Sequence, residues 1–218
     1  MQFSLWITLL LACVVISFTP GAGAINTMGN ALTHGFRRAI WGILGQQAAL
    51  VIHIAIVALG VGVLVASSDL AFNVIRYAGA AYLVYLGIRQ MLQKPALEPE
   101  DVGEADASAG GPARGRAVES RWSMFRRGLW VNLLNPKAIV FFLAFLPQFI
   151  RPGQPLLPQY LVVSATVVLV DVAVMWGFFA LAARGFRRFT RTERGQRVLN
   201  VVFGVLFIAV ALLLVFVH

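Results

Sequence analysis

Long runs of apolar residues alternate with short polar stretches along the whole chain. A transmembrane helix needs about 20 mainly apolar residues to cross a hydrocarbon core of about 30 Å. The runs are continuous and lack the strict alternation of an outer-membrane barrel strand. We therefore predict an all-α integral membrane protein with six transmembrane helices, at about 3–24, 40–66, 71–91, 129–150, 161–183 and 198–217.

The first run admits a second interpretation, because Ala22-Gly23-Ala24 has the small-residue form of a signal-peptide cleavage site. The segment at its start, MQFSLW, carries no lysine or arginine, which favours a transmembrane helix instead. Cys13 is the only cysteine of the chain, so the sequence predicts neither a disulfide nor a cysteine-ligated metal. We expect no cofactor and no metal site.

The composition changes abruptly between the third and fourth runs. The segment 95–120 has no aromatic residue and is rich in Ala, Gly and Pro, so it cannot bury enough apolar surface to fold. This divides the chain into transmembrane helices 1–3 in residues 1–92, a flexible cytoplasmic linker in 93–123, and transmembrane helices 4–6 in 124–218.

Three helices in each half is an odd number, so a shared fold would place the halves in opposite orientations, as in many secondary transporters. Two short matches at one common offset support this 3+3 inverted repeat. They pair Phe18-Thr19-Pro20-Gly21 with Phe145-Leu146-Pro147-Gln148, and Asn73-Val74-Ile75 with Asn200-Val201-Val202.

The distribution of charge predicts the orientation in the membrane. The chain has 18 Lys and Arg residues and a net charge of +9, and most of the basic residues follow the first, third and fifth runs. The positive-inside rule places these three loops in the cytoplasm and both termini outside. No nucleic-acid partner is predicted, because a stretch such as FRRFTRTERGQR is a short connector and not a folded basic face.

The fourth run, NLLNPKAIVFF, places Lys137 about 12 Å inside the predicted helix, at 1.5 Å per residue. An ammonium group there costs on the order of 2.5–3.5 kcal/mol and usually faces a bundle interior or a watery cavity. Pro136 interrupts the helix and frees a carbonyl, so Asn132 and Asn135 stand where broken backbone needs partners. The alternative is that Lys137 extends along the helix to the cytoplasmic headgroups.

Asp171 lies near the middle of the fifth run and is the only acid within any predicted span. A carboxyl group at this depth can bind and release a proton during a transport cycle, and this is our hypothesis for Asp171. The alternative is a static ion pair with Lys137. The two interpretations agree if the pair breaks and reforms.

The second run contains Gln46, Gln47 and, at its centre, His53. Gln46 and His53 are seven positions apart, so one helix face could present both to the centre of the bundle. A single intramembrane histidine is more often a hydrogen-bonded packing residue than a proton relay, and both interpretations of His53 stay open.

In the first run, the stretch FTPGAGAINT predicts a loosened helix, because proline frees a carbonyl and glycine permits close backbone approach. Two interrupted helices, one in each half, are the best sequence indication of a transporter's binding site. The alternative is that Gly21 and Gly23 only let a neighbouring helix pack closely.

Three segments closely resemble the LysE/RhtB family of bacterial amino-acid exporters: TPGAGAINTM with the following LTHGFRRA, AFNVIRYAGAAYLVYLGIRQ, and VNLLNPKAIVFFLAFLPQF. GAGAINTM, IHI and VDVAVM are most similar to its homoserine and homoserine lactone efflux branch. The family's motifs correspond to Thr19-Pro20-Gly21 and to Asn135-Pro136-Lys137. Many members have a second proline where this chain has Ala22, which leaves the bend of the first helix open.

The resemblance implies a six-helix carrier of the bacterial inner membrane that exports small neutral amino acids, such as homoserine, homoserine lactone or threonine, with the proton gradient as driving force. Lys137 would bind the substrate carboxylate, and Asp171 or carbonyls near Pro20 would bind its ammonium group. The expected partners are the substrate, the proton and the lipid bilayer. The GAGA and AGAA runs would also permit helix pairing in a homo-oligomer.

The competing functions are a passive channel and an exporter of another small amphiphilic metabolite, because polar residues in a cavity also serve a pore. An enzyme is not predicted. The sequence has no second buried carboxylate, no HExxH motif and no serine–histidine pair at helical spacing.

Overall fold

The computed structural model describes residues 3–19, 21–61, 69–93, 119–151, 153–190 and 192–216 of the 218-residue chain. The regular structure of these residues is helical throughout, in agreement with the predicted fold class. The elements in chain order are α1 (Phe3–Phe18), α2 (Ala22–His34), α3 (Phe36–Ile56), the π-helix η1 (Val57–Val61), α5 (Asp69–Leu92), α6 (Arg121–Leu133), α7 (Pro136–Phe145), the 3₁₀ helix η3 (Leu146–Phe149), α8 (Leu156–Val174), the π-helix η4 (Met175–Ala180), α9 (Leu181–Thr190) and α10 (Glu193–Phe216).

Within the described ranges, three helical segments are long and apolar enough to cross a membrane: Phe36–Gly60, Leu156–Gly185 and Glu193–Leu212. Two bent helix pairs also qualify if each pair is one span, α1 with α2 and α6 with α7–η3. The number of spans by length and composition is therefore three to five. The third predicted span, 71–91, lies within α5, which is 24 residues long.

The fourth predicted span is wrong as a single helix over 129–150. The helix begins earlier, at Arg121, and two helices meet at a bend of 57°. Pro136 cannot donate a backbone hydrogen bond and holds the preceding Asn135 in an extended conformation. Asn135 then caps the new helix, since its side chain accepts the N–H of Lys137 at 3.1 Å. A local sequence signal thus places the break.

The first predicted span is also wrong as one helix over 3–24. The axes of α1 and α2 differ by 58°, and α2 continues to His34, well beyond the predicted end. Gly21 is extended and precedes the first turn of α2. Pro20, which the sequence marks as the break, lies outside the described residues, as does most of the predicted linker.

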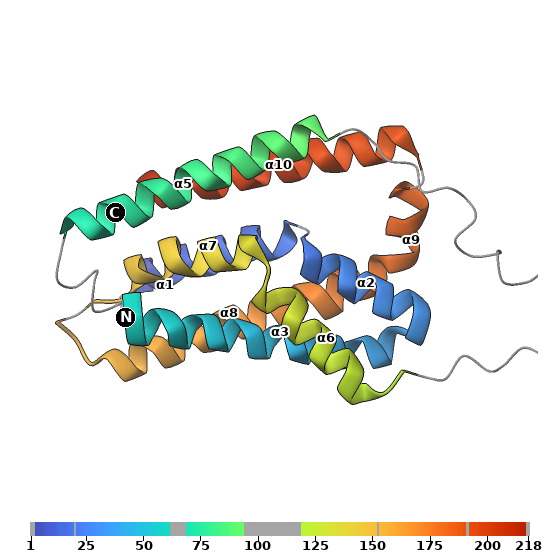
Figure 1. Ribbon diagram of the computed structural model, residues 1–218, viewed down its shortest axis with the longest axis horizontal. Helices are drawn as coiled ribbons and strands as arrows, with labels where there is room; N and C mark the ends of the chain where they lie inside the picture. The colour runs from blue at the N-terminus through green and yellow to red at the C-terminus, as the bar shows by residue number, and fades with distance from the viewer. Residues whose placement is uncertain are drawn as a thin grey trace, which may run out of the picture.

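Close backbone contacts join the helices into two groups. An added Cβ atom at Gly45 of α3 would lie 1.9 Å from the carbonyl oxygen of Phe125 in α6, and one at Gly128 would lie 2.0 Å from that of Gly42. In the same way, a Cβ atom at Gly87 of α5 would lie 2.7 Å from a carbonyl oxygen of α10. Small residues let helix backbones approach this closely. Figure 1 shows the result, with α5 and α10 side by side as a layer over the remaining helices.

The two ends of the molecule differ in charge. Both termini lie at one end, whereas the α2–α3 turn, the end of α5, the start of α6 and the α9–α10 connection lie at the other (Figure 1). The second end is therefore the one that carries the basic stretches at 37–38, 126–127, 184–188 and 194–197.

We expect Gly45→Ala and Gly128→Ala to destabilise the protein, because a new methyl group would meet backbone atoms that cannot move aside. Overpacking of this kind costs about 1–3 kcal/mol. The measurement is the thermal unfolding temperature of the detergent-purified protein. Gly29→Ala is the matched control, because nothing lies within 4 Å of its Cβ position. Equal unfolding temperatures for the three variants would contradict this packing.

Candidate functional site

The two helix breaks face each other, and Lys137 joins them. Its Nζ atom, from the first turn of α7, donates to the carbonyl oxygen of Ile16 at 3.0 Å and to that of Thr19. These carbonyls are at the C-terminal end of α1, where the helix lacks its own donors and carries the negative end of its dipole. Proline at position 20 has no N–H to offer to Ile16, whose carbonyl otherwise accepts the N–H of Thr19 at 3.2 Å, a donor shared with Val15. The ammonium group supplies a further donor, so Lys137 does not extend to the headgroup region.

Asp171 of α8 faces the same space but has other partners. It accepts hydrogen bonds from Ser17 Oγ at 3.1 Å and from Gln47 Nε2 at 2.6 Å. No ion pair within 4.0 Å joins Asp171 to Lys137, both of which the structure describes. The static ion pair considered above is therefore absent from this conformation. The ammonium group of Lys137 and the carboxylate of Asp171 therefore bind different partners and do not neutralise each other.

Asparagine and glutamine side chains connect the segments around the breaks. Gln46 Nε2 donates to the carbonyl of Gly23 and to Thr27 Oγ1, both at 3.1 Å. Asn132 Nδ2 donates to the backbone carbonyl of Gln46 at 3.1 Å. Gly23 has a steric reason to lack a side chain, because an added Cβ would lie 3.1 Å from Gln46 Oε1. The glycine thus makes room for the glutamine.

Asn135 and Thr19 also contribute to the breaks. Asn135 Nδ2 lies 3.4 Å from Asn132 Oδ1, while its own oxygen caps α7. Thr19 is fully buried, and its hydroxyl donates to the Val15 carbonyl at 2.8 Å. Thr19 therefore contributes its backbone carbonyl to the site, and this carbonyl accepts a hydrogen bond from Lys137.

His53 supports the second break from outside the cavity. Its Nε2 atom lies 3.2 Å from the carbonyl oxygen of Leu133, and its ring stacks on Phe142 with 5.7 Å between ring centres. A continuous helix would satisfy that carbonyl with the N–H of Lys137, which instead bonds to the Asn135 cap. The geometry favours the packing interpretation of His53.

A small cavity of ≈ 50 Å³ lies between the breaks and α8, with polar walls that include Ser17, Gly23, Gln46, Asn132, Lys137 and Asp171. Its far side is apolar, formed by Leu50, Phe141 and Val167 among others. This volume holds a few water molecules, whereas ligand pockets usually measure about 300–1,000 Å³. A substrate would have to widen it.

A larger cavity of ≈ 710 Å³ adjoins the small one. Gly21, Asn135 and Lys137 line both, and Pro136 lines the larger one alone. Of the residues predicted for the site, all that the structure describes lie around these cavities or contact a residue that lines them, His53 through its stacking on Phe142. Ser17 and Thr27 are absent from the prediction. No signal marks them, because a hydroxyl in an apolar helix is ordinary.

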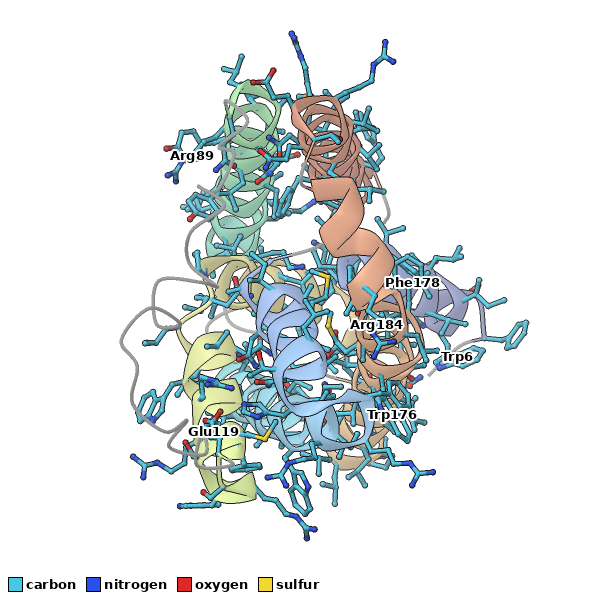
Figure 2. The ribbon with its side chains drawn as sticks, turned by 90° about the vertical axis from the view of Figure 1, so that its right-hand side faces the viewer. Trp6, Arg89, Glu119, Trp176, Phe178 and Arg184 are labelled. Carbon is cyan, nitrogen blue, oxygen red and sulfur yellow. The ribbon has the colours of Figure 1, made fainter. Side chains whose placement is uncertain are left out.

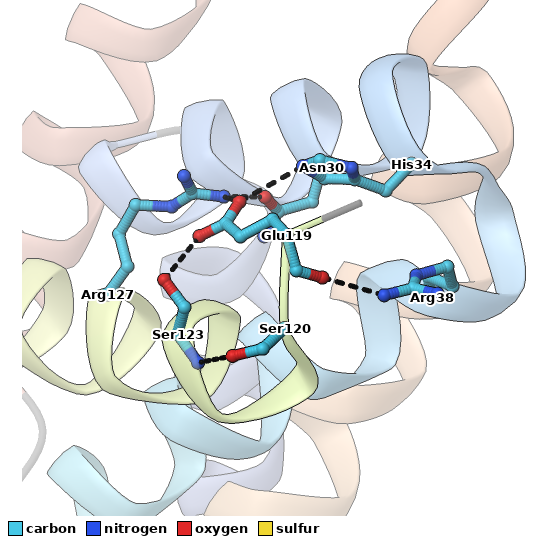
Figure 3. Close-up of polar contacts among 7 residues, drawn as sticks. All are labelled: Asn30, His34, Arg38, Glu119, Ser120, Ser123 and Arg127. Atoms are coloured by element: carbon cyan, nitrogen blue, oxygen red, sulfur yellow. Dashed lines mark hydrogen bonds and ion pairs between the residues drawn. The ribbon is translucent and has the colours of Figure 1, made fainter. Parts of the chain in front are cut away.

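A second polar cluster, formed by Asn30, His34, Arg38, Glu119, Ser120, Ser123 and Arg127, lies at the basic end of the molecule (Figure 3). Glu119 Oε2 lies 3.0 Å from His34 Nε2 and 3.0 Å from a guanidinium nitrogen of Arg127, and Oε1 accepts the Ser123 hydroxyl. Arg38 donates to the Glu119 backbone carbonyl at 2.7 Å. The cluster connects α2, α3 and α6 through a residue that the sequence assigned to the linker.

The pKa of Glu119 reflects these contacts. Partial burial alone would raise it, but the hydrogen bond from Ser123 and the charges of Arg127 and His34 together lower it below the ordinary value. The carboxylate of Glu119 is thus the charged centre of the cluster.

Among the described residues, no group of three or more His, Cys, Asp and Glu side chains is placed to hold a metal ion.

Comparison with known proteins gives consistent matches over nearly the whole chain. The sequence pattern of the LysE type translocator family matches residues 14–217. A homoserine/homoserine lactone efflux protein of Salmonella typhimurium is 41% identical over 214 residues, which are 98% of this chain and 97% of the relative. An uncharacterized membrane protein of Vibrio cholerae is 37% identical over 98% of both chains. A leucine efflux protein of Klebsiella pneumoniae is 26% identical over 94% of this chain and 92% of its own. No solved structure matches.

Glu119→Gln should make the protein less stable at neutral pH, by about 1 kcal/mol, because it removes the charge shared by Arg127 and His34. A carboxyl group whose pKa is lowered on folding stabilises the protein above its unfolded pKa, and this contribution is lost as the pH falls through the folded pKa. The wild type should therefore lose stability on acidification more steeply than the variant. Thermal unfolding in detergent across the acidic range measures this, and parallel losses in both proteins would contradict it.

Proposed function

The chain belongs to the LysE family of translocators, and we propose that it is a secondary transporter that exports homoserine, homoserine lactone or a similar small neutral amino acid in exchange for protons. Its relatives are named as efflux proteins, so it is an amino-acid efflux transporter and not an enzyme. The substrates named for relatives support the narrower choice of substrate for this chain.

The observation that carries the proposal is the contact of Lys137 with the carbonyl end of α1. A zwitterionic amino acid needs a cation for its carboxylate and oxygen acceptors for its ammonium group. Both are present at one place, because Lys137 now occupies the carbonyls of Ile16 and Thr19. When a zwitterionic substrate such as homoserine binds, its ammonium group takes over these carbonyls and its carboxylate receives Lys137. After the exchange, the carbonyls and Lys137 each still have a charge-assisted hydrogen-bond partner.

Asp171 is the second acceptor and the proton site of this mechanism. The buried Gln47 Oε1, whose amide nitrogen donates to Asp171, has no hydrogen-bond partner among the described residues, so another acceptor lies beside the carboxylate. Protonation of Asp171 from outside weakens its attraction for the substrate ammonium group and favours release there. Loss of the proton to the cytoplasm then resets the site.

The six-span, 3+3 inverted architecture belongs to the same proposal. Each half begins with a bent helix pair, continues with a helix that contains a π-turn, and ends with a helix of 24 residues. The predicted match of Phe18–Gly21 with Phe145–Gln148 does not align the breaks, because the second break is at Leu134 and Asn135. The basic connections at one end support a bacterial inner-membrane protein with both termini outside.

Inside-out vesicles that contain the protein should accumulate labelled homoserine when a proton gradient is imposed, and an uncoupler should abolish the accumulation. Threonine and leucine, measured in parallel, define the substrate range. Equilibration without accumulation would indicate a passive channel. No uptake of any of the three would point to another amphiphilic metabolite and overturn the proposed substrate.

Lys137→Met and Asp171→Asn should each abolish accumulation while the protein still inserts into the membrane, because each removes one of the two charges that the substrate exchanges. The matched controls are Arg126→Gln and Glu193→Gln, which remove an exposed charge of the same sign outside both cavities. The readout is initial uptake rate per inserted protein. Normal rates in either site variant would refute the assigned role of that residue.

A further inference from the structure

The larger cavity, which we call the vestibule, lies between the second half of α5, the start of α7 and α10. Its volume of ≈ 710 Å³ is within the range of small-molecule sites. It reaches Lys137 from the side of Asn135 and Gly21, which separate it from the small cavity. The vestibule therefore adjoins both the last turns of α5, at the basic end of the molecule, and Lys137.

The position of α5 leaves one of its faces uncovered. Gly87 packs directly on the backbone of α10, and Gln90 Nε2 donates to Asn200 Oδ1 at 2.9 Å. These contacts turn the opposite face, with Tyr85, Arg89 and Leu92, away from α10. Tyr85 is 55% exposed and Leu92 is 76% exposed, although both line the vestibule.

Arg89 provides the chemistry of this face. It is the one cation besides Lys137 among the described residues that line the vestibule. Figure 2 shows it on the side of α5 away from α10. No contact within the described part of the chain occupies its guanidinium group. Arginine presents a planar fork of donors that matches a carboxylate.

We propose that the vestibule is the cytoplasmic route of the substrate to Lys137, and that Arg89 binds the carboxylate of a zwitterionic amino acid within it. This inference rests on the proposed function. It adds a specificity rule, because homoserine has a free carboxylate, whereas its lactone has that carboxyl group closed into a neutral ring ester. Arg89 therefore favours the open amino acid and contributes nothing to binding of the lactone.

A purely structural role for Arg89 is the competing explanation, since a cation in the last turn of a helix also interacts with the helix dipole. The two roles differ in what they predict. Loss of a structural contact affects every substrate equally, whereas loss of a carboxylate contact affects only substrates that have one. Two substrates therefore separate the explanations.

The test is initial uptake of labelled homoserine and of labelled homoserine lactone into inside-out vesicles with the wild type, Arg89→Gln, Arg89→Lys and the control Arg126→Gln. We expect Arg89→Gln to raise the KM for homoserine about three- to fivefold, as for an exposed ion pair, with kcat unchanged. The KM for the lactone should stay at the wild-type value. Arg89→Lys should restore part of the loss, because it keeps the charge without the fork.

An equal rise in KM for both substrates, or an unchanged KM for homoserine, would overturn the role of Arg89. The wild type still transports in these outcomes, so they do not contradict the proposed function. Absence of uptake by the wild type would overturn the proposed function, and this inference with it.

Discussion

Backbone carbonyls freed by a helix break have no water to bond to at the depth of a bilayer, so the protein itself must supply their donors. Here the second break provides them for the first, because Lys137 reaches from α7 to the end of α1. His53 does the same for Leu133 at the second break, from a third helix. The arrangement of α1, α3 and α7 around the site depends on these two contacts. Each contact also gives a buried polar side chain, Lys137 or His53, the hydrogen-bond acceptor that it needs.

The contact of Lys137 has a further consequence for transport. A cation bound to neutral carbonyls is held more loosely than one paired with a carboxylate, and Asp171 stands apart with its own donors. A zwitterion can therefore insert between the two without first breaking an ion pair. The small cavity and the vestibule meet at Lys137, so the group that we propose as the binding partner of the substrate carboxylate lies between the two spaces.

Rigid and movable parts of the molecule are distinguished by their packing. Gly42, Gly45 and Gly128 bring the backbones of α3 and α6 into direct contact, and Gly87 does the same for α5 and α10. Direct backbone contact resists sliding, so each pair acts as a unit. The vestibule lies between the α5–α10 layer and the broken helices, and among the described glycines none brings backbones into direct contact there. Widening of the site for a substrate is therefore expected at this boundary.

The class of fold and part of the site can be predicted from the local chemistry of the sequence. Apolar runs indicate membrane helices, and Pro136 behind Asn135 indicates a capped break, because proline lacks a donor and asparagine replaces it within two residues. The lengths of the broken helices were harder to predict. Hydropathy averages over a window, so it does not register a bend, and α2 and α6 are polar enough at their ends to be taken for loops.

Contacts between distant segments could not be read in this way. Ser17 and Asp171 are 154 positions apart, and nothing in either neighbourhood specifies the other. The same is true of Glu119, which lies in the segment predicted as a linker but binds His34 and Arg127. The sequence by itself determined that the chain is helical, that it lives in a membrane, and that Lys137 and Asp171 need polar surroundings. Only the tertiary structure decided that Lys137 binds the carbonyls of α1 and not Asp171, because the choice of partner depends on where packed helices place each side chain.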